Sequence, residues 1–103
     1  MVDTTPLTRA VDHFADRLRA APQSRLQRGA AAEALALARE MARRAQARET
    51  PGAEPREMPD AGMFAAADQI TVAGRDLALV LTGDGDVEDA VRLVGDAQQR
   101  AGV

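Results

Sequence analysis

Acidic side chains gather in residues 82–89, TGDGDVED, where their type suggests metal binding. Carboxylate oxygens are the ligands that Ca²⁺ and Mg²⁺ prefer in proteins, and this stretch holds four: Asp84, Asp86, Glu88 and Asp89. A calcium-binding EF-hand loop starting at Asp84 would end on a carboxylate at the position of Gly95, so the spacing does not fit. We expect these residues to end one helix, form a turn and begin the next helix, without a metal site.

The sequence contains one histidine, His13, and no cysteine. A Ser-His-Asp arrangement would depend on His13, and a zinc site made of three histidines or of thiolates is impossible. The spacing places His13 between Arg9, Asp16 and Arg17 on the polar side of a helix, which is typical of a solvated residue. We therefore expect a protein that is not an enzyme and that has no catalytic residue, metal or cofactor.

Four arginines fall on one side of a long helix predicted over residues 25–49: Arg25, Arg28, Arg39 and Arg43. Such a row could neutralise phosphates, which is how nonspecific affinity for nucleic acid begins. However, the chain has a net charge of −3, and the row has no aromatic side chains that could stack on bases. We expect this face to meet solvent or an acidic protein partner rather than nucleic acid.

The charges divide unevenly along the chain. Residues 1–49 hold nine arginines and six acids, whereas residues 50–103 hold four arginines and ten acids. Complementary halves of this kind attract each other, either within one chain or between subunits. All thirteen basic residues are arginine, a bias that indicates a GC-rich bacterial genome.

Apolar residues recur every three or four positions in four segments, which predicts an all-α fold. We expect one domain of 103 residues, a four-helix bundle with helices over residues 6–21, 25–49, 61–82 and 87–101. Thr5, Ser24, Asp60 and Asp86 are the expected N-caps, and Gly83 the expected left-handed glycine after the third helix. Residues 50–59, TPGAEPREMP, contain three prolines and predict an extended connection, which Met58 could anchor to the core.

The third helix carries apolar residues on two sides. Its main stripe comprises Met63, Ala66, Ala67, Ile70, Ala73, Gly74, Leu77, Val80 and Leu81. A second row lies opposite, at seven-residue intervals: Ala65, Val72 and Leu79. Two apolar sides predict a central helix with two neighbours, and Gly74 predicts a close helix crossing. An alternative interpretation makes residues 70–72 and 77–81 the strands of a hairpin.

These features favour a helical protein–protein interaction module, a homodimeric bacterial adaptor or regulator. The second row of the third helix is the expected interface, with Asp68, Arg75 and Asp76 as its polar rim. The neighbour of that row could instead be a helix of the same chain. The alternatives are a DNA-associated regulator that uses the arginine row and a carrier of a small apolar ligand. No leader or membrane-spanning segment is recognisable, so we expect a cytoplasmic protein.

Overall fold

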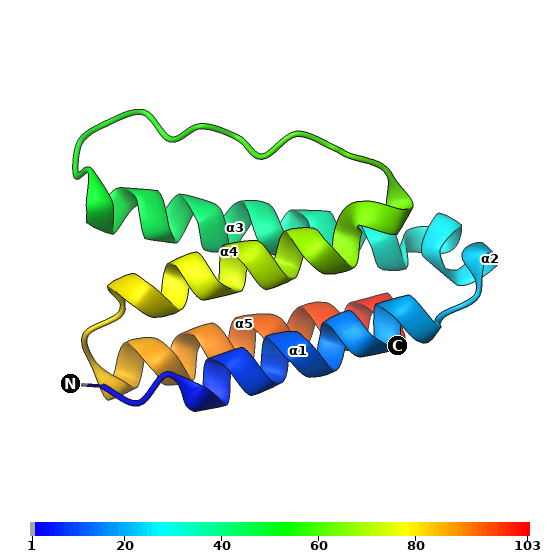
Figure 1. Ribbon diagram of the computed structural model, residues 1–103, viewed down its shortest axis with the longest axis horizontal. Coiled ribbons are helices and arrows are strands. Elements are labelled where there is room, and N and C mark those ends of the chain that lie inside the picture. The colour runs from blue at the N-terminus through cyan, green and yellow to red at the C-terminus, as the bar shows by residue number, and fades with distance from the viewer. Residues whose placement is uncertain (1) are drawn as a thin grey trace.

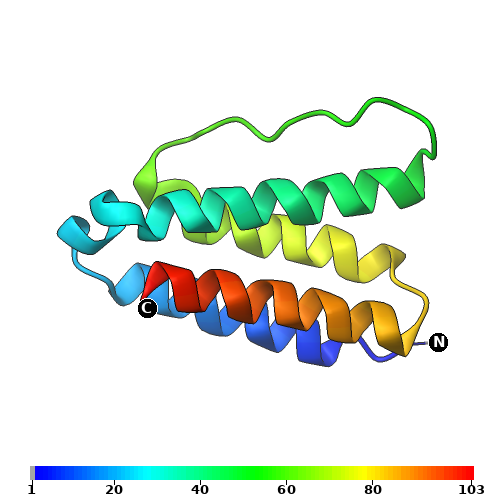
Figure 2. The same ribbon diagram turned by 180° about the vertical axis from the view of Figure 1, so that it is seen from behind.

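The computed structural model describes residues 2–103 and shows a four-helix bundle (Figures 1 and 2). Its main helices are α1 (Thr5–Ala20), α3 (Ala31–Glu49), α4 (Ala66–Val80) and α5 (Asp84–Ala101). No strand occurs in the described part of the chain, so the all-α prediction is confirmed and the hairpin interpretation is wrong. None of the helices in residues 2–103 is long and apolar enough to cross a membrane.

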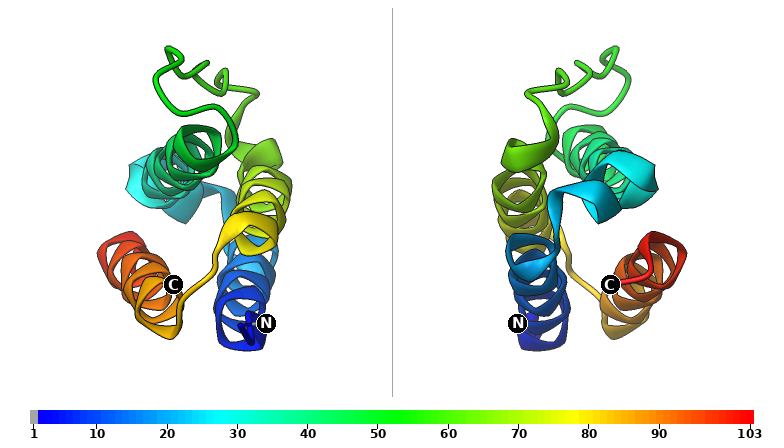
Figure 3. Two further views of the ribbon diagram at one scale, coloured as in Figure 1. Left: turned by 90° about the vertical axis from the view of Figure 1, so that its left-hand side faces the viewer. Right: turned by 90° about the vertical axis from the view of Figure 1, so that its right-hand side faces the viewer.

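The four helices form a ring in the order α1, α4, α3, α5, as the end-on views show (Figure 3). α1 and α5 run in one direction, and α3 and α4 run in the other (Figure 1). Parallel neighbours need a long crossover, and residues 50–62, which we call the strap, return along the outside of α3 to provide it (Figure 2). The two helices before the strap, α1 and α3, lie diagonally opposite each other, and so do the two after it, α4 and α5.

The core is apolar throughout the described residues, with no buried polar or charged residue among them. Its largest fully buried side chains are Leu7, Phe14, Met41, Ile70, Leu77 and Val94. Much of the rest is alanine, which lets the helices pack closely. α1 and α4 approach closely at Gly74, where an added Cβ would lie only 2.8 Å from Cγ2 of Val11. The predicted close crossing at Gly74 is confirmed.

The helix predicted over residues 25–49 is interrupted at Gly29. α2 (Gln23–Arg25) leads into the π-helical turn η1 (Leu26–Ala30), and α3 begins only after it. Gly29 has φ 145°, which L side chains rarely adopt, so the chain bends there. The bend was not predicted, because the apolar pattern of a helix continues on both sides of Gly29.

Thr5 and Ser24 lie near the starts of the first two helices, but neither is the N-cap of its helix. Thr5 was expected to be the N-cap, but α1 already includes Thr5 and its N-cap is Thr4; the N–H of Thr5 donates to the carboxylate of Asp3 at 2.9 Å. Ser24 lies inside α2 and makes no side-chain cap, because the turn already starts after Pro22. α1 also ends at Ala20 instead of residue 21.

The ends of the last two helices also differ from the prediction. Asp60 accepts the N–H of Gly62 at 2.8 Å in a turn before the 3₁₀ turn η2 (Met63–Ala65), and α4 follows that turn. Gly83 has φ −125° and precedes α5 instead of closing α4 in a left-handed conformation. α5 therefore starts three residues earlier than predicted, and Asp86 lies in its first turn, where it pairs with an arginine of α3.

Ion pairs join the basic first half of the chain to the acidic second half. Three of them link two main helices: Arg19 with Asp68 (2.8 Å), Arg48 with Asp86 (3.0 Å) and Glu33 with Arg100 (2.9 Å). Each pair connects a helix before the strap to a helix after it. In the first two pairs the arginine belongs to the basic half and the acid to the acidic half, so the expected attraction acts within one chain there, although each exposed pair adds little stability by itself.

Candidate interaction surface

The outward side of α4 exposes three large apolar side chains. Phe64 is 73% exposed, Val72 is 55% exposed and Leu79 is 84% exposed, and the rest of the described chain exposes no other large apolar residue. Phe64 belongs to η2, directly before α4, and the other two belong to α4 itself. Packing against α1 and α3 covers the opposite side of the helix and leaves these three side chains more than half exposed.

The exposed residues follow the spacing of a helix seam. From Phe64 the steps are four residues to Asp68, four to Val72, three to Arg75 and four to Leu79. Steps of three and four keep residues on one side of a helix. We call these five residues the α4 outer face. It is a narrow row with apolar ends, an apolar centre and one charge of each sign between them.

The predicted interface overlaps this face but is not identical to it. Val72 and Leu79 face outward as expected, and no helix of the same chain covers them. Ala65 is half-buried in η2, where the tighter 3₁₀ geometry changes the phase of the side chains. Phe64 takes the outward position that had been assigned to Ala65. Steps of three and four counted back from Leu79 lead to Phe64 and to Ala65 alike, so periodicity could not separate the two residues.

The expected polar rim divides into one paired and two unpaired side chains. Nη2 of Arg19 in α1 donates to Oδ1 of Asp68 at 2.8 Å. Arg75 and Asp76 are exposed and form no ion pair within residues 2–103. The face therefore offers an unpaired guanidinium group close to its centre.

The four predicted arginines of the basic row do not form one free surface. Three guanidinium groups bind oxygen atoms of their own chain: Arg25 binds the carbonyl of Gly102 (2.8 Å), Arg39 binds the carbonyl of Met58 (2.8 Å) and Arg43 binds Glu40 (3.0 Å). The bend at Gly29 separates the first two arginines of the row from the last two. Arg28 is exposed. A continuous row that could follow a phosphate backbone is therefore not presented.

Two arginines of α3 favour the ionised form of Glu40 on the same helix. Nε of Arg44 donates to Oε2 of Glu40 at 2.9 Å, and Nη2 of Arg43 donates to Oε1 at 3.0 Å. The hydrogen bond from Arg44 lowers the pKa of Glu40 below its ordinary value, and the hydrogen bond from Arg43 has a smaller effect in the same direction. Glu40 is thus held ionised as part of a local surface cluster.

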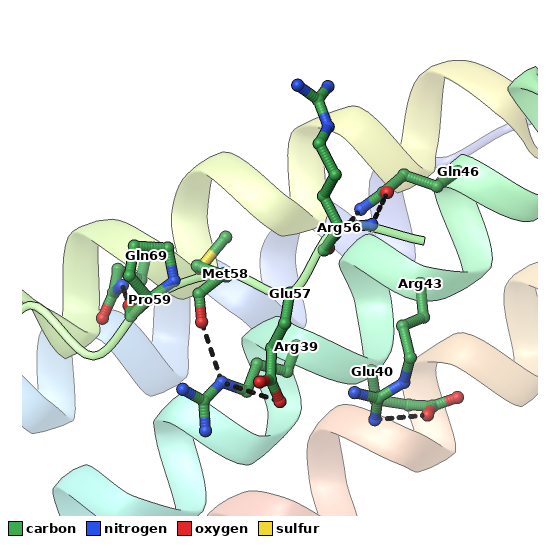
Figure 4. A network of polar contacts seen from close by, with 9 residues as sticks. All are labelled: Arg39, Glu40, Arg43, Gln46, Arg56, Glu57, Met58, Pro59 and Gln69. Atoms are coloured by element: carbon green, nitrogen blue, oxygen red, sulfur yellow. Dashed lines mark hydrogen bonds and ion pairs between the residues drawn. The ribbon is translucent and has the colours of Figure 1, made fainter. Parts of the chain in front are cut away.

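Side chains of α3 and α4 hold the strap through its backbone (Figure 4). The side-chain amide of Gln46 accepts the N–H of Arg56 at 2.7 Å and donates to the carbonyl of the same residue at 3.1 Å. Arg39 donates to the carbonyl of Met58 at 2.8 Å, and Gln69 donates to the carbonyl of Pro59 at 2.8 Å. Met58 is half-buried against the core, so its predicted role as an anchor is confirmed. The strap is fixed to the bundle although it has no regular secondary structure.

The surface also has open grooves. One of about 490 Å³ lies between the start of α1 and the first turns of α5, with Asp3, Asp84 and Glu88 in its walls. Another of about 330 Å³ lies beside the strap, between α3 and α4. Within residues 2–103 no three acidic, histidine or cysteine side chains come together as metal ligands, and His13 is exposed. In the described part of the chain, neither groove is lined by a histidine, serine, threonine or cysteine.

The chain matches no protein family model, no curated protein and no solved structure. The interpretation of the α4 outer face therefore depends on the residues of this chain alone.

Proposed function

We propose that this protein is a non-enzymatic protein–protein interaction module that self-associates through the α4 outer face. The observation that carries the proposal is the placement of Phe64, Val72 and Leu79, the three large exposed apolar side chains, in one row along η2 and α4. Single exposed apolar residues are common on protein surfaces, whereas all three large ones in one row, with one charge of each sign between them, favour an interaction site. An adaptor or regulatory role would follow from the availability of this surface.

Burial of the row supplies the driving force for association. Moving a side chain such as leucine or phenylalanine from water into an apolar contact is worth roughly 1.5–3 kcal/mol. A chain with only two aromatic residues, one of them exposed, has little further apolar volume to bury within its own core. A second copy would cover the row without any change in the bundle.

The test is the double substitution Val72→Glu with Leu79→Glu, studied by analytical ultracentrifugation and circular dichroism. We expect the unmodified chain to be dimeric at about 100 µM, a concentration that reveals micromolar affinity. The double variant should be a monomer with unchanged helix content, because neither side chain lies in the core.

A matched control places the same two charges elsewhere. Gln27 and Gln99 are exposed on η1 and α5, so Gln27→Glu with Gln99→Glu changes the net charge equally without altering the α4 outer face. This control should remain dimeric. A monomeric unmodified chain at the same concentration, or a dimer that survives the substitutions at Val72 and Leu79, would overturn the proposal.

A further inference from the structure

We propose that the two copies pair α4 against α4 in an antiparallel arrangement, with a two-fold axis that passes between Thr71 and Val72. This inference depends on the proposed self-association and specifies its geometry. It follows from the order of apolar and charged residues along the α4 outer face, which reads apolar, acidic, apolar, basic, apolar. That order is complementary to its own reverse.

Two-fold symmetry fixes which residues meet. When an antiparallel helix pair has its axis between positions 71 and 72, a residue one step before the axis meets the residue one step after it in the other copy. Three kinds of contact result: Phe64 with Leu79, Asp68 with Arg75, and Thr71 with Val72. Each occurs twice. One register thus buries all three exposed apolar side chains and forms two ion pairs between the copies.

The charges discriminate between the two possible directions of pairing. A parallel two-fold pair would place Asp68 against Asp68 and Arg75 against Arg75, and like charges at such positions destabilise a helix contact. It would also separate the phenylalanine ring from the smaller leucine that complements it. The antiparallel pair exchanges both repulsions for attractions.

The ion pair with Arg19 leaves Asp68 available for this contact. Arg19 binds Oδ1 of Asp68, so Oδ2 remains free to accept from Arg75 of the second copy. The carboxylate is held in place by α1 before association, which reduces the entropy lost when it binds a second guanidinium group. Arg75 has no ion-pair partner in residues 2–103, so no existing ion pair must break before it binds Asp68 of the second copy.

The seam is short, so the affinity should be moderate. Phe64 and Leu79 are fifteen residues apart, which corresponds to about 22 Å along a helix. A single helix pair of this length lies at the small end of specific interfaces, where association is transient. We therefore expect a dissociation constant in the micromolar range.

Charge exchange tests the register. Asp68→Arg and Arg75→Asp should each weaken self-association about tenfold, because each homodimer would then contain two like-charge contacts. An equimolar mixture of the two variants should associate as the unmodified chain does, since every contact in the mixed dimer joins opposite charges. The chain that carries both substitutions should also associate normally. Asp96→Arg, an exposed change on α5, is the control and should leave association unchanged.

Cysteine crosslinking gives a second measurement, and the native chain contains no cysteine to interfere. Under mild oxidation Val72→Cys should form a disulfide-linked dimer, because its two copies lie on either side of the axis, offset by only about 1.5 Å along the helices. Phe64→Cys alone should not, since its two copies would lie about 22 Å apart by the helix rise. The double variant Phe64→Cys with Leu79→Cys should crosslink, and Ser24→Cys, exposed on α2, should not.

The outcomes separate this inference from the proposed function. Failure of the unmodified chain to self-associate removes both. A dimer that is lost with Val72→Glu and Leu79→Glu, but that crosslinks through Phe64→Cys alone or is insensitive to the charge changes, keeps the interaction surface and overturns the antiparallel register.

Discussion

The inner and outer sides of α4 are both apolar, yet they meet different surroundings. Ile70 and Leu77 on the inner side are fully buried, and Gly74 between them touches α1. Val72 and Leu79 on the outer side lie in solvent. The inner side combines large side chains with a glycine that admits a neighbouring helix, whereas the outer side has no helix against it. Stability of the fold and association of the chain are therefore assigned to opposite sides of one helix.

The largest expected difference between the two sides concerns truncation of a large side chain. Ile70→Ala should lower the free energy of unfolding by about 2–5 kcal/mol, because it removes fully buried methyl groups and leaves a cavity. Leu79→Ala should change it by no more than about 0.5 kcal/mol when the chain is monomeric. Chemical denaturation at low protein concentration compares them. Equal losses would show that the outer side also belongs to the core.

A smaller effect is expected at the close crossing of α1 and α4. Gly74→Leu should destabilise the fold by roughly 1–3 kcal/mol, because the added side chain overlaps Val11. Gly95→Ala is the contrast, since a Cβ at this helical glycine of α5 meets nothing within 4 Å. It should stabilise the fold by up to about 1 kcal/mol through helix propensity. An unchanged melting temperature for Gly74→Leu would contradict the tight inner contact.

The smallest expected effect belongs to the solvent side of α3, which supports α4 from the inner side. Glu40→Gln should cost about 0.3–0.5 kcal/mol near neutral pH, because it removes a surface pair with Arg44. The pKa of Glu40 is lowered in the folded chain, so its ionised form stabilises the fold above the unfolded pKa. That contribution is lost as the pH falls through the folded pKa, which lies below the ordinary value of a glutamate.

Unfolding of both chains as a function of pH tests this sign. The difference between Glu40→Gln and the unmodified chain should shrink on acidification and vanish once Glu40 is protonated. Glu54→Gln, in the exposed part of the strap, removes a carboxylate outside the ion pairs of residues 2–103 and should show no such trend. A difference that grew at low pH would mean that Glu40 is destabilising when charged.

Periodicity was sufficient to predict the four helices, the two sides of α4 and the approach at Gly74, because these depend on side chains repeated along one element. It failed where geometry depends on a single backbone angle. The φ of Gly29 breaks a helix whose apolar pattern continues past it, and the 3₁₀ turn at residues 63–65 moves Phe64 outward. The hydrogen bonds that hold the strap join residues distant in sequence, such as Arg39 and Met58, and have no local pattern.

Because of the ring order of the helices, the strap also holds together two parts of the core that depend on each other. Each large helix contact joins a helix that precedes the strap to one that follows it, so neither α1 with α3 nor α4 with α5 can cover its own apolar side chains. The chain consists of two half-cores of opposite charge that complete each other. The strap keeps them together at an effective concentration on the order of millimolar. Cutting it would turn folding into a second-order reaction between two peptides, whose rate would rise with the concentration of each.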